Sequence, residues 1–220
     1  MAGYSNQKVF ILYEDEHLLV VKKPFGMESQ RGKSFAMDQE SLLRGYLSSK
    51  TKTDNPYLAV VHRLDRPVAG VMVYAKTKKA AADLSAQLQT ENFSKKYEAV
   101  VSGIVPACEG RLEDYLTADK RTGTTSVSSK ADPLAKKAVL TWKEIAREEV
   151  KSGEILLPYA SNPSPEGGWH FLSIVLETGR HHQIRAQLSH AGMPIAADVR
   201  YGGAKVHGPR GAIALCAAQL

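Results

Sequence analysis

Short runs of apolar and β-branched residues recur along the whole chain, whereas only a few segments have helical spacing. We expect strands at 9–13, 18–21, 57–61, 71–75, 97–101, 138–145 and 171–176, and helices at 41–47, 78–89 and 181–191. Polar stretches at 121–130 and 161–168 predict a loop or exposed hairpin and a loop, respectively. Because strands and helices do not alternate strictly, the pattern favours an α+β fold. With 220 residues and no convincing linker, we expect one domain.

The composition excludes several classes of protein. With 43% hydrophobic and 24% charged residues, the chain is neither disordered nor fibrous. No apolar run reaches the roughly 18 residues of a membrane span, and the first eight residues are too polar for a signal peptide. Two cysteines, Cys108 and Cys216, exclude a disulfide framework and an all-cysteine metal site, which favours a cytosolic protein. The net charge of +6 hints only weakly at an anionic partner.

The densest group of reactive side chains is His-Arg-Leu-Asp-Arg at positions 62–66, between two expected strands. A carboxylate between two guanidinium groups is expected to stay ionised, and ionised Asp65 could act as a nucleophile or a general base. A surface ion-pair cluster at a turn is the alternative, and these five residues alone favour it. Pro67 and Gly70 mark a tight turn in either case.

A second polar group ends at Arg185, in the stretch Gly-Arg-His-His-Gln-Ile-Arg. On a helix, His182 and Arg185 would share a polar face, and Ile184 and Leu188 a core face. His181 and His182 would diverge by about 100° on such a helix. No carboxylate or thiol lies at ligand spacing beside them, so we do not expect a zinc site.

Tyr97 lies in a third segment, Lys-Lys-Tyr-Glu-Ala-Val-Val-Ser-Gly at 95–103, and alone it supports no functional role, because a strand tyrosine usually packs in the sheet. Together, however, the three segments resemble the RluA-type RNA pseudouridine synthases. Stretches 11–26, 62–76, 96–103 and 179–202 match the family's opening, catalytic, tyrosine and arginine motifs in order. The resemblance runs from about Val9 to the end of the chain.

This resemblance implies a pseudouridine synthase fold, with a mixed, largely antiparallel central sheet flanked by helices and loops. It also implies a single catalytic domain over residues 1–220, with no separate RNA-binding domain before it. The implied activity is the isomerisation of selected uridines to pseudouridine in structured RNA, either rRNA or tRNA. We expect a cytoplasmic monomer that uses no cofactor and no metal and contacts no membrane.

The resemblance also assigns roles to individual residues. Asp65 corresponds to the catalytic aspartate, Arg185 to the arginine that pairs with it, and Tyr97 to the tyrosine that stacks on the target base. Arg63 corresponds to the arginine that fills the space vacated by a flipped uridine. Further candidates for phosphate or pocket contacts, each with a structural role equally open, are Lys23, His62, Arg66 and Arg180.

Two departures from the family pattern bear on activity. Val-Ala-Gly at 68–70 stands where members commonly carry Thr-Ser-Gly or Val-Ser-Gly, which removes one hydroxyl near the catalytic loop. The apolar run 212–220 resembles a late core strand, and relatives usually continue beyond it. We therefore expect a domain that is either shortened at its C-terminus or covers the resulting sheet edge by association. Two alternatives to the isomerase activity stay open. One is an inactive RNA-binding module on the same fold, and the other is a hydrolase that uses Asp65 on a nucleoside or sugar.

Overall fold

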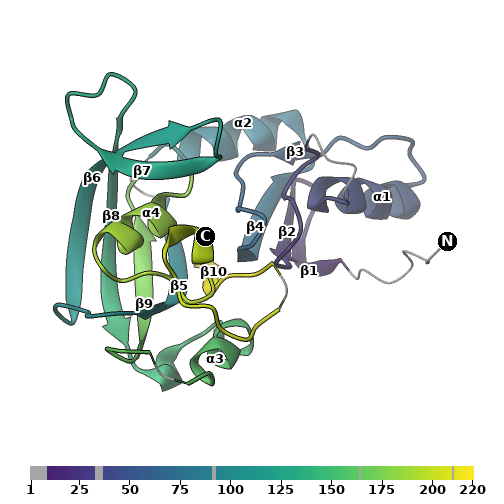
Figure 1. Ribbon diagram of the computed structural model, residues 1–220. Helices are drawn as coiled ribbons and strands as arrows, with labels where there is room; N and C mark the ends of the chain where they lie inside the picture. Colours follow the sequence, from purple (N-terminus) through teal and green to yellow (C-terminus); the bar gives the residue numbers. More distant parts are fainter. Residues whose placement is uncertain (1–8, 33–36, 91–92, 164, 210) are drawn as a thin grey trace. The chain divides into compact units, whose positions relative to one another are not determined.

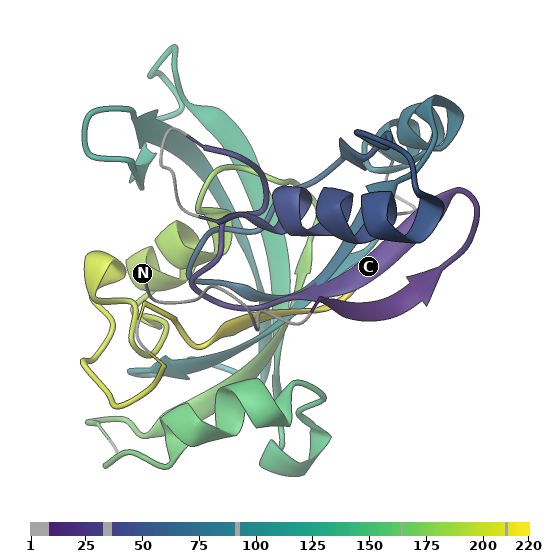
Figure 2. The ribbon, with the colours of Figure 1, turned by 90° about the vertical axis from the view of Figure 1, so that its right-hand side faces the viewer.

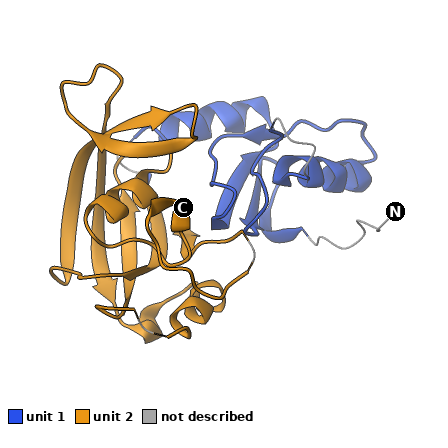
Figure 3. Ribbon diagram, in the orientation of Figure 1, with its two compact units in different colours: residues 1–93 blue, residues 94–220 orange. Residues whose placement is uncertain are grey.

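The computed structural model describes residues 9–32, 37–90, 93–163, 165–209 and 211–220. The chain divides into two compact units, residues 1–93 and residues 94–220 (Figure 3). Each unit combines antiparallel strands with helices, which confirms the expected α+β class and the largely antiparallel sheet. That the whole chain forms one catalytic domain stays a prediction.

Where the structure describes it, unit 1 is built on three antiparallel strands with a short fourth. The strands are β1 (Phe10–Glu14), β2 (Leu18–Lys23), β3 (Ala59–Val60) and β4 (Ala69–Ala75). β2 pairs with both β1 and β4, and β3 pairs with the end of β4. Side chains in β2 alternate between buried and half-buried, and the buried row ends on Lys23. The buried face of this strand therefore carries an ammonium group at a position where an apolar side chain is usual.

Two capped helices accompany this sheet. Asp38 accepts the N–H of Ser41 at the start of α1 (Gln39–Thr51), and Thr77 accepts the N–H of Ala80 at the start of α2 (Lys78–Gln87). Such caps satisfy N–H groups that have no partner within the helix. Figure 2 shows α1 across β1 and β2, and Tyr46 of α1 donates to Glu14 of β1 at 2.8 Å. α2 packs on β3 and β4.

Unit 2 carries a larger antiparallel sheet (Figure 1). Along this sheet the strands follow the order β10, β5, β9, β8, β6, β7. Their bounds are β5 (Lys95–Ser102), β6 (Glu109–Asp119), β7 (Thr124–Ser128), β8 (Lys136–Ile145), β9 (Trp169–Leu176) and β10 (Leu215–Gln219). β6 and β7 form the hairpin that the polar stretch 121–130 allowed.

The described residues of unit 2 also form two helices and two 3₁₀ turns. The helices are α3 (Gly153–Ala160) and α4 (Gln183–His190), and the 3₁₀ turns are η1 (Arg147–Glu149) and η2 (Val199–Tyr201). Glu98 of β5 caps α3 from a distance, because its carboxylate accepts the N–H groups of Lys151 (3.2 Å) and Ser152 (2.7 Å). α4 packs on β6 and β7. In the part of the chain that the structure describes, no helix has the length and apolarity to cross a membrane.

Most expected elements are present, and the differences have physical reasons. Apart from 57–61, of which only Ala59–Val60 is a strand, the expected strands lie within two residues of their expected ends. Strand β6 is missing from the prediction because charged, exposed residues occupy its alternate positions: Glu109, Arg111 and Glu113. Helix α3 is also missing, since it contains Pro158, which ordinarily argues against a helix interior.

Candidate active site

Segment 62–66 forms the connection from β3 to β4 in unit 1, and backbone contacts hold it at successive residues. The Nε2 atom of His62 accepts the N–H of Val73 in β4 at 3.0 Å. The hydroxyl of Ser29 accepts the N–H of Leu64 (3.0 Å) and donates to the carbonyl of the same residue (2.7 Å). Both peptide groups of Leu64 are thus bound by one buried side chain, which fixes the backbone directly before Asp65.

The backbone directly after Asp65 is fixed by the loop that follows β2. The carbonyl of Arg66 accepts the N–H of Gly26 at 2.8 Å, and Nε of Arg66 donates to the carbonyl of Gly26 at 3.0 Å. Gly26 has φ of +78°, a conformation that favours glycine. Asp65 itself is half-buried, and its carbonyl accepts the N–H of Val68 at 3.0 Å, which closes a turn. This polypeptide segment, 62–68, is called the aspartate loop below.

Lys23 connects the two loops from inside the protein. Its side chain is 0% exposed, and its ammonium donates to the carbonyls of Met27 (2.7 Å), Pro24 (2.9 Å) and Arg66 (3.4 Å). Burial lowers the pKa of Lys23 to about 7, although the negative charges of Asp65 and Glu28 act in the opposite direction. These contacts are those of the structural role that the sequence left open for Lys23.

The other basic candidates of unit 1 differ in their surroundings. His62 accepts a backbone N–H from β4, again a structural contact. Arg63 and Arg66 are exposed on either side of the half-buried Asp65. Among the residues that the structure describes, none binds the side chain of Arg63. The aspartate loop therefore carries two guanidinium groups at the surface beside its carboxylate.

Tyr97 lies in unit 2, in the middle of β5. It pairs with Ile174 of β9 on one side and with Ala217 of β10 on the other, and its side chain is 8% exposed. The central position in three paired strands gives the ring a fixed place on one face of the sheet. Its neighbour Glu98 caps α3, as described above. The role of Tyr97 in stacking on a base stays a prediction.

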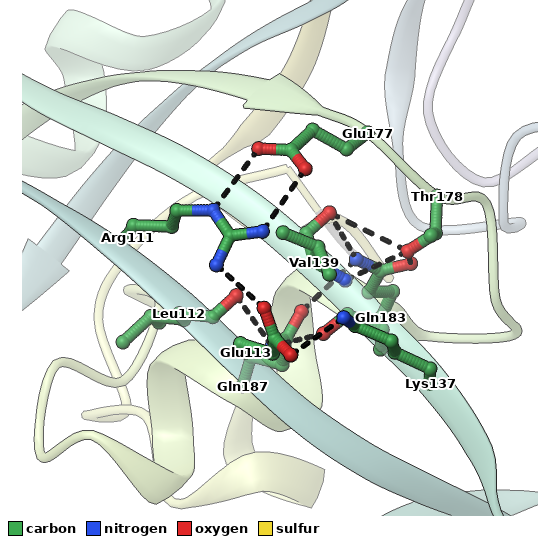
Figure 4. Close-up of polar contacts among 10 residues, drawn as sticks. Arg111, Leu112, Glu113, Lys137, Val139, Glu177, Thr178, Gln183 and Gln187 are labelled. Carbon is green, nitrogen blue, oxygen red and sulfur yellow. Dashed lines mark hydrogen bonds and ion pairs between the residues drawn. The ribbon is translucent and has the colours of Figure 1, made fainter. Parts of the chain in front are cut away.

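Arg185 lies on α4. Two buried glutamines of α4, Gln183 and Gln187, attach this helix to the sheet (Figure 4). The amide of Gln183 donates to the carbonyl of Val139 and to Oε1 of Gln187, both at 3.0 Å. The Nε2 atom of Gln187 donates to Oδ2 of Asp114 (2.7 Å) and to the carbonyl of Ala138 (3.3 Å). Side-chain amides thus join α4 to β8 and β6.

The Oε1 atom of Gln183 fixes the segment before α4. It accepts the hydroxyl of Thr178 at 2.8 Å and the backbone N–H of Arg180 at 3.0 Å. Arg180 is exposed, and its Nε donates to the carbonyl of Lys137 at 2.9 Å. Gln183 therefore shapes the turn into the helix as well as attaching the helix.

The guanidinium of Arg185 is buried and forms an ion pair with Asp198. Nε donates to Oδ2 of Asp198 at 2.6 Å, and Nη2 donates to Oδ1 at 2.8 Å. Arg185 is 5% exposed and Asp198 is 1% exposed. Two parallel N–H···O bonds of this kind fix the plane of the guanidinium as well as its position. Sequence reasoning selected Arg185 but gave no separate role to Asp198, although Asp198 belongs to the same motif.

One expectation about the histidine pair is wrong. Helix α4 begins at Gln183, and His182 has φ of 50° and ψ of 26°, so the two histidines do not follow helical geometry. Their rings stack, with centroids 3.8 Å apart and planes 24° apart. Throughout the described ranges, no group of three or more His, Cys, Asp or Glu side chains could hold a metal ion.

Comparison with known proteins identifies the family. Residues 17–190 match the model of the RNA pseudouridylate synthase family, a span that includes the aspartate loop, Tyr97 and α4. The chain belongs to this family. The resemblance to RluA-type pseudouridine synthases is thereby confirmed.

Curated relatives include rRNA and tRNA enzymes. The chain is 34% identical to ribosomal large subunit pseudouridine synthase D of Pseudomonas aeruginosa, over 88% of this chain and 53% of that protein. It is 30% identical to tRNA pseudouridine synthase C of Yersinia pestis, over 87% of this chain and 70% of that protein. The chain spans about half the length of several curated relatives that it matches.

Solved structures support the pseudouridine synthase fold. Human RNA pseudouridylate synthase domain containing 4 superposes with a TM-score of 0.69 at 21% identity, over 94% of this chain and 82% of that one. Human RNA pseudouridylate synthase domain containing 1 gives 0.69 at 19% identity, over 99% and 79%. The sequence-based prediction of the fold is confirmed.

The first prediction concerns the buried ammonium. Lys23→Met should lower the free energy of unfolding by about 2–4 kcal/mol, because three carbonyls would lose their donor. Urea unfolding measures this, and Lys78→Met, on the exposed side of α2, should change stability by less than about 0.5 kcal/mol. Equal stability of the two variants would show that Lys23 does not hold the loops together.

The second prediction concerns the attachment of α4. Gln187→Met keeps the side-chain length but removes the amide, so Asp114 and the carbonyl of Ala138 lose a donor and Gln183 loses an acceptor. We expect a loss of about 2 kcal/mol in urea unfolding. Gln89→Met, at an exposed position after α2, is the matched control and should be nearly neutral. A neutral effect of Gln187→Met would contradict the proposed attachment.

Proposed function

We propose that the chain is an RNA pseudouridine synthase that isomerises selected uridines of rRNA or tRNA, with Asp65 as the catalytic residue. The observation that carries this proposal is the aspartate loop, which holds a half-buried carboxylate between two fixed backbone segments in a member of this family. Names of relatives point to both rRNA and tRNA as substrate classes.

The reaction needs a fixed anion and no net loss of atoms. The N1–C1′ bond of uridine breaks, the uracil turns within the site and C5 forms the new bond to C1′. C5 then loses its proton to water, and N1 takes up a proton from water, so no atom is lost overall. A carboxylate near C1′ suits the positive charge that develops at the sugar, as in glycosidases. Attack on C1′, addition to the ring and removal of the C2′ proton would each use the same carboxylate. The contacts that hold the aspartate loop restrict the movement of this carboxylate in each of these three mechanisms.

Arg185 and Tyr97 are assigned to the same reaction. The two parallel bonds to Asp198 fix the plane of the Arg185 guanidinium, and a guanidinium held in this way can orient a second carboxylate. The ring of Tyr97 offers a flat face for uracil, and its hydroxyl can donate or accept a proton. Neither role requires a cofactor or a metal.

The exposed guanidinium groups are assigned to RNA. A uridine must leave its stack to reach a catalytic carboxylate, which costs a few kcal/mol. Arg63 lies two residues before Asp65 and is exposed, so its side chain can occupy the vacated space. Arg66 and Arg180 are also exposed and can contact phosphates. Lys23 and His62 are assigned to the support of the loop. Action as a monomer in the cytoplasm stays a prediction.

The third prediction tests the catalytic assignment. RNA labelled with tritium at C5 of uridine should release the label with the unaltered chain, because the C5–H bond breaks during isomerisation. Asp65→Asn should lower the release by at least about 10⁴-fold and leave RNA affinity within about threefold, since an amide cannot replace the anion but keeps its shape.

Asp83→Asn, at an exposed position of α2, is the matched control and should release tritium at the unaltered rate. Release that persists in Asp65→Asn would contradict the assignment of Asp65. Binding of RNA without release by the unaltered chain would favour an inactive module, and accumulation of free uracil would favour a hydrolase. Mapping pseudouridine in cells with and without the protein would identify the RNA.

A further inference from the structure

Two adjacent histidines stack directly before α4, and the proposed function gives them no role. The ring centroids of His181 and His182 lie 3.8 Å apart, with 24° between the planes. Neighbouring side chains on a helix point about 100° apart, so this contact needs a different backbone. His182 provides it with φ of 50° and ψ of 26°, in the left-handed region. A residue with a Cβ stays in that region only where its surroundings impose it, and such residues cluster at functional sites.

His182 forms the inner half of the stack. Its Nδ1 atom lies 2.8 Å from the hydroxyl of Tyr201, and the two rings meet edge to face with their centroids 5.6 Å apart. Burial, assisted by the positive charge of Arg185, lowers the pKa of His182 to about 3. This ring is therefore neutral at neutral pH, so it supports its neighbour with a flat face and adds no charge of its own.

His181 forms the outer half, and one residue of β7 fixes both halves. The hydroxyl of Thr125 lies 2.9 Å from Nδ1 of His181, and the N–H of Thr125 donates to the hydroxyl of Tyr201 at 2.8 Å. Thr125 is buried, whereas His181 is exposed. Because one face of the His181 ring lies against His182, the other face is the one that solvent can reach. Holding the ring in advance lowers the entropic cost for a ligand that stacks on it.

Arg200 of η2 brings a positive charge beside the stack. It is exposed, and its Nη1 atom donates at 3.3 Å to the carbonyl of Gly123, close in sequence to the Thr125 that holds His181. Its charge also contributes to the lowered pKa of His182, which agrees with a position near the two rings. A guanidinium has five N–H groups, and this bond uses one of them. A flat ring and a guanidinium therefore lie at one surface, and these are groups that bind the base and the phosphate of a nucleotide.

The turn between β6 and β7 adds further charges. Lys120 and Arg121 are exposed there. The same turn carries the carboxylate of Asp119, which accepts the N–H of Arg121 (2.8 Å) and the hydroxyl of Thr122 (2.9 Å). Together with Arg200, the two cations of the turn outnumber this carboxylate. The balance of charge around the stack therefore favours an anionic ligand.

We propose that the exposed face of His181 is a stacking platform for an unpaired base of the RNA substrate, and that Arg200 binds a phosphate of the same strand. This inference rests on the proposed function, because it takes RNA as the ligand. Every base has a flat face that can stack on an aromatic side chain, whereas neighbouring base pairs cover both faces within a double helix. The platform therefore selects a nucleotide in a loop, in a bulge or at an end.

The first test measures binding of the full chain to a single-stranded RNA of about 12 uridines. His181→Leu and His181→Phe both lose the contact with Thr125, but only His181→Leu loses the flat face. We expect His181→Leu to raise Kd by about 5- to 10-fold and His181→Phe to stay within about twofold of the unaltered chain. The matched control is His190→Leu, at the exposed end of α4, and it should leave Kd unchanged. Equal Kd values for the two His181 variants overturn the inference, as does failure of the unaltered chain to bind the RNA.

A second test replaces the single strand with an RNA duplex of the same length. His181→Leu should change the Kd of the duplex by less than about twofold, because its paired bases present no free face along the helix. A loss of affinity for the duplex as large as that for the single strand overturns the inference.

The dependence of Kd on salt separates stacking from charge. Each phosphate contact on a single strand contributes about 0.7 to the slope of the logarithm of the binding constant against the logarithm of the salt concentration. Arg200→Gln should reduce this slope by about 0.7, and His181→Leu should leave it unchanged. A slope reduced by His181→Leu would show that the imidazole contacts a phosphate as a cation, which overturns the stacking role. A slope unchanged by Arg200→Gln overturns the role of Arg200.

Tritium release distinguishes failure of this inference from failure of the proposed function. If the unaltered chain releases tritium from labelled rRNA and tRNA transcripts while the two His181 variants bind RNA equally, the inference fails and the proposed function stands. If the variants differ as expected but the unaltered chain releases no tritium, the isomerase activity fails, and the platform stands as part of an RNA-binding module.

Discussion

The aspartate loop depends on one buried ammonium group. Lys23 ends the inward row of β2, where an apolar residue would fill space but could not satisfy the carbonyls of two neighbouring loops. Its three donors meet three carbonyl groups, a geometry that an ammonium can satisfy and a hydrocarbon side chain cannot. Burying this charge is costly, as its lowered pKa shows. The carbonyls and the nearby negative charges offset that cost. Because the ammonium of Lys23 binds the carbonyl of Arg66, it also helps to fix the position of Asp65.

In unit 2, side-chain amides and an ion pair fix the position of a candidate functional side chain, Arg185. Helix α4 has only eight residues, too few to hold a fixed position through helix propensity alone. Gln183 and Gln187 attach it to strand backbones, and Asp198 binds the arginine between them. Each of these polar groups is buried with partners, so together they define one arrangement. An apolar helix face would have allowed small rotations that move a guanidinium.

Prediction from sequence succeeded where local pattern decides the outcome. Alternation and turn residues located most strands, and the order of four motifs identified the family and hence the fold. It failed where a distant partner decides. Helix α3 contains a proline and is capped by Glu98, more than fifty positions earlier in the chain. The left-handed conformation of His182, which ended the expected helical relation with His181, is likewise not visible in a helical pattern.

The partners of Lys23 and Arg185 are also distant in the sequence or set by the folded backbone, so the local pattern did not predict them. For Lys23 the sequence left a phosphate contact and a structural role equally open, because nothing local shows that β2 ends inside the protein. Asp198 stood thirteen positions beyond Arg185, in a segment whose shape depends on Ala197 and Gly203. Sequence selected the residues that carry chemistry, whereas the groups that support them required the folded backbone.

The attachment of α4 has a consequence for how the domain can change over evolutionary time. Gln183 and Gln187 bind three backbone carbonyls, at Val139, Ala138 and Leu112, in addition to the side chains of Thr178 and Asp114. Every residue has such a carbonyl, so these three strand positions can exchange side chains of similar size without weakening the hold on the helix. The residues that must then stay unchanged are the two glutamines and their side-chain partners, Thr178 and Asp114, whereas Val139, Ala138 and Leu112 are freer to diverge.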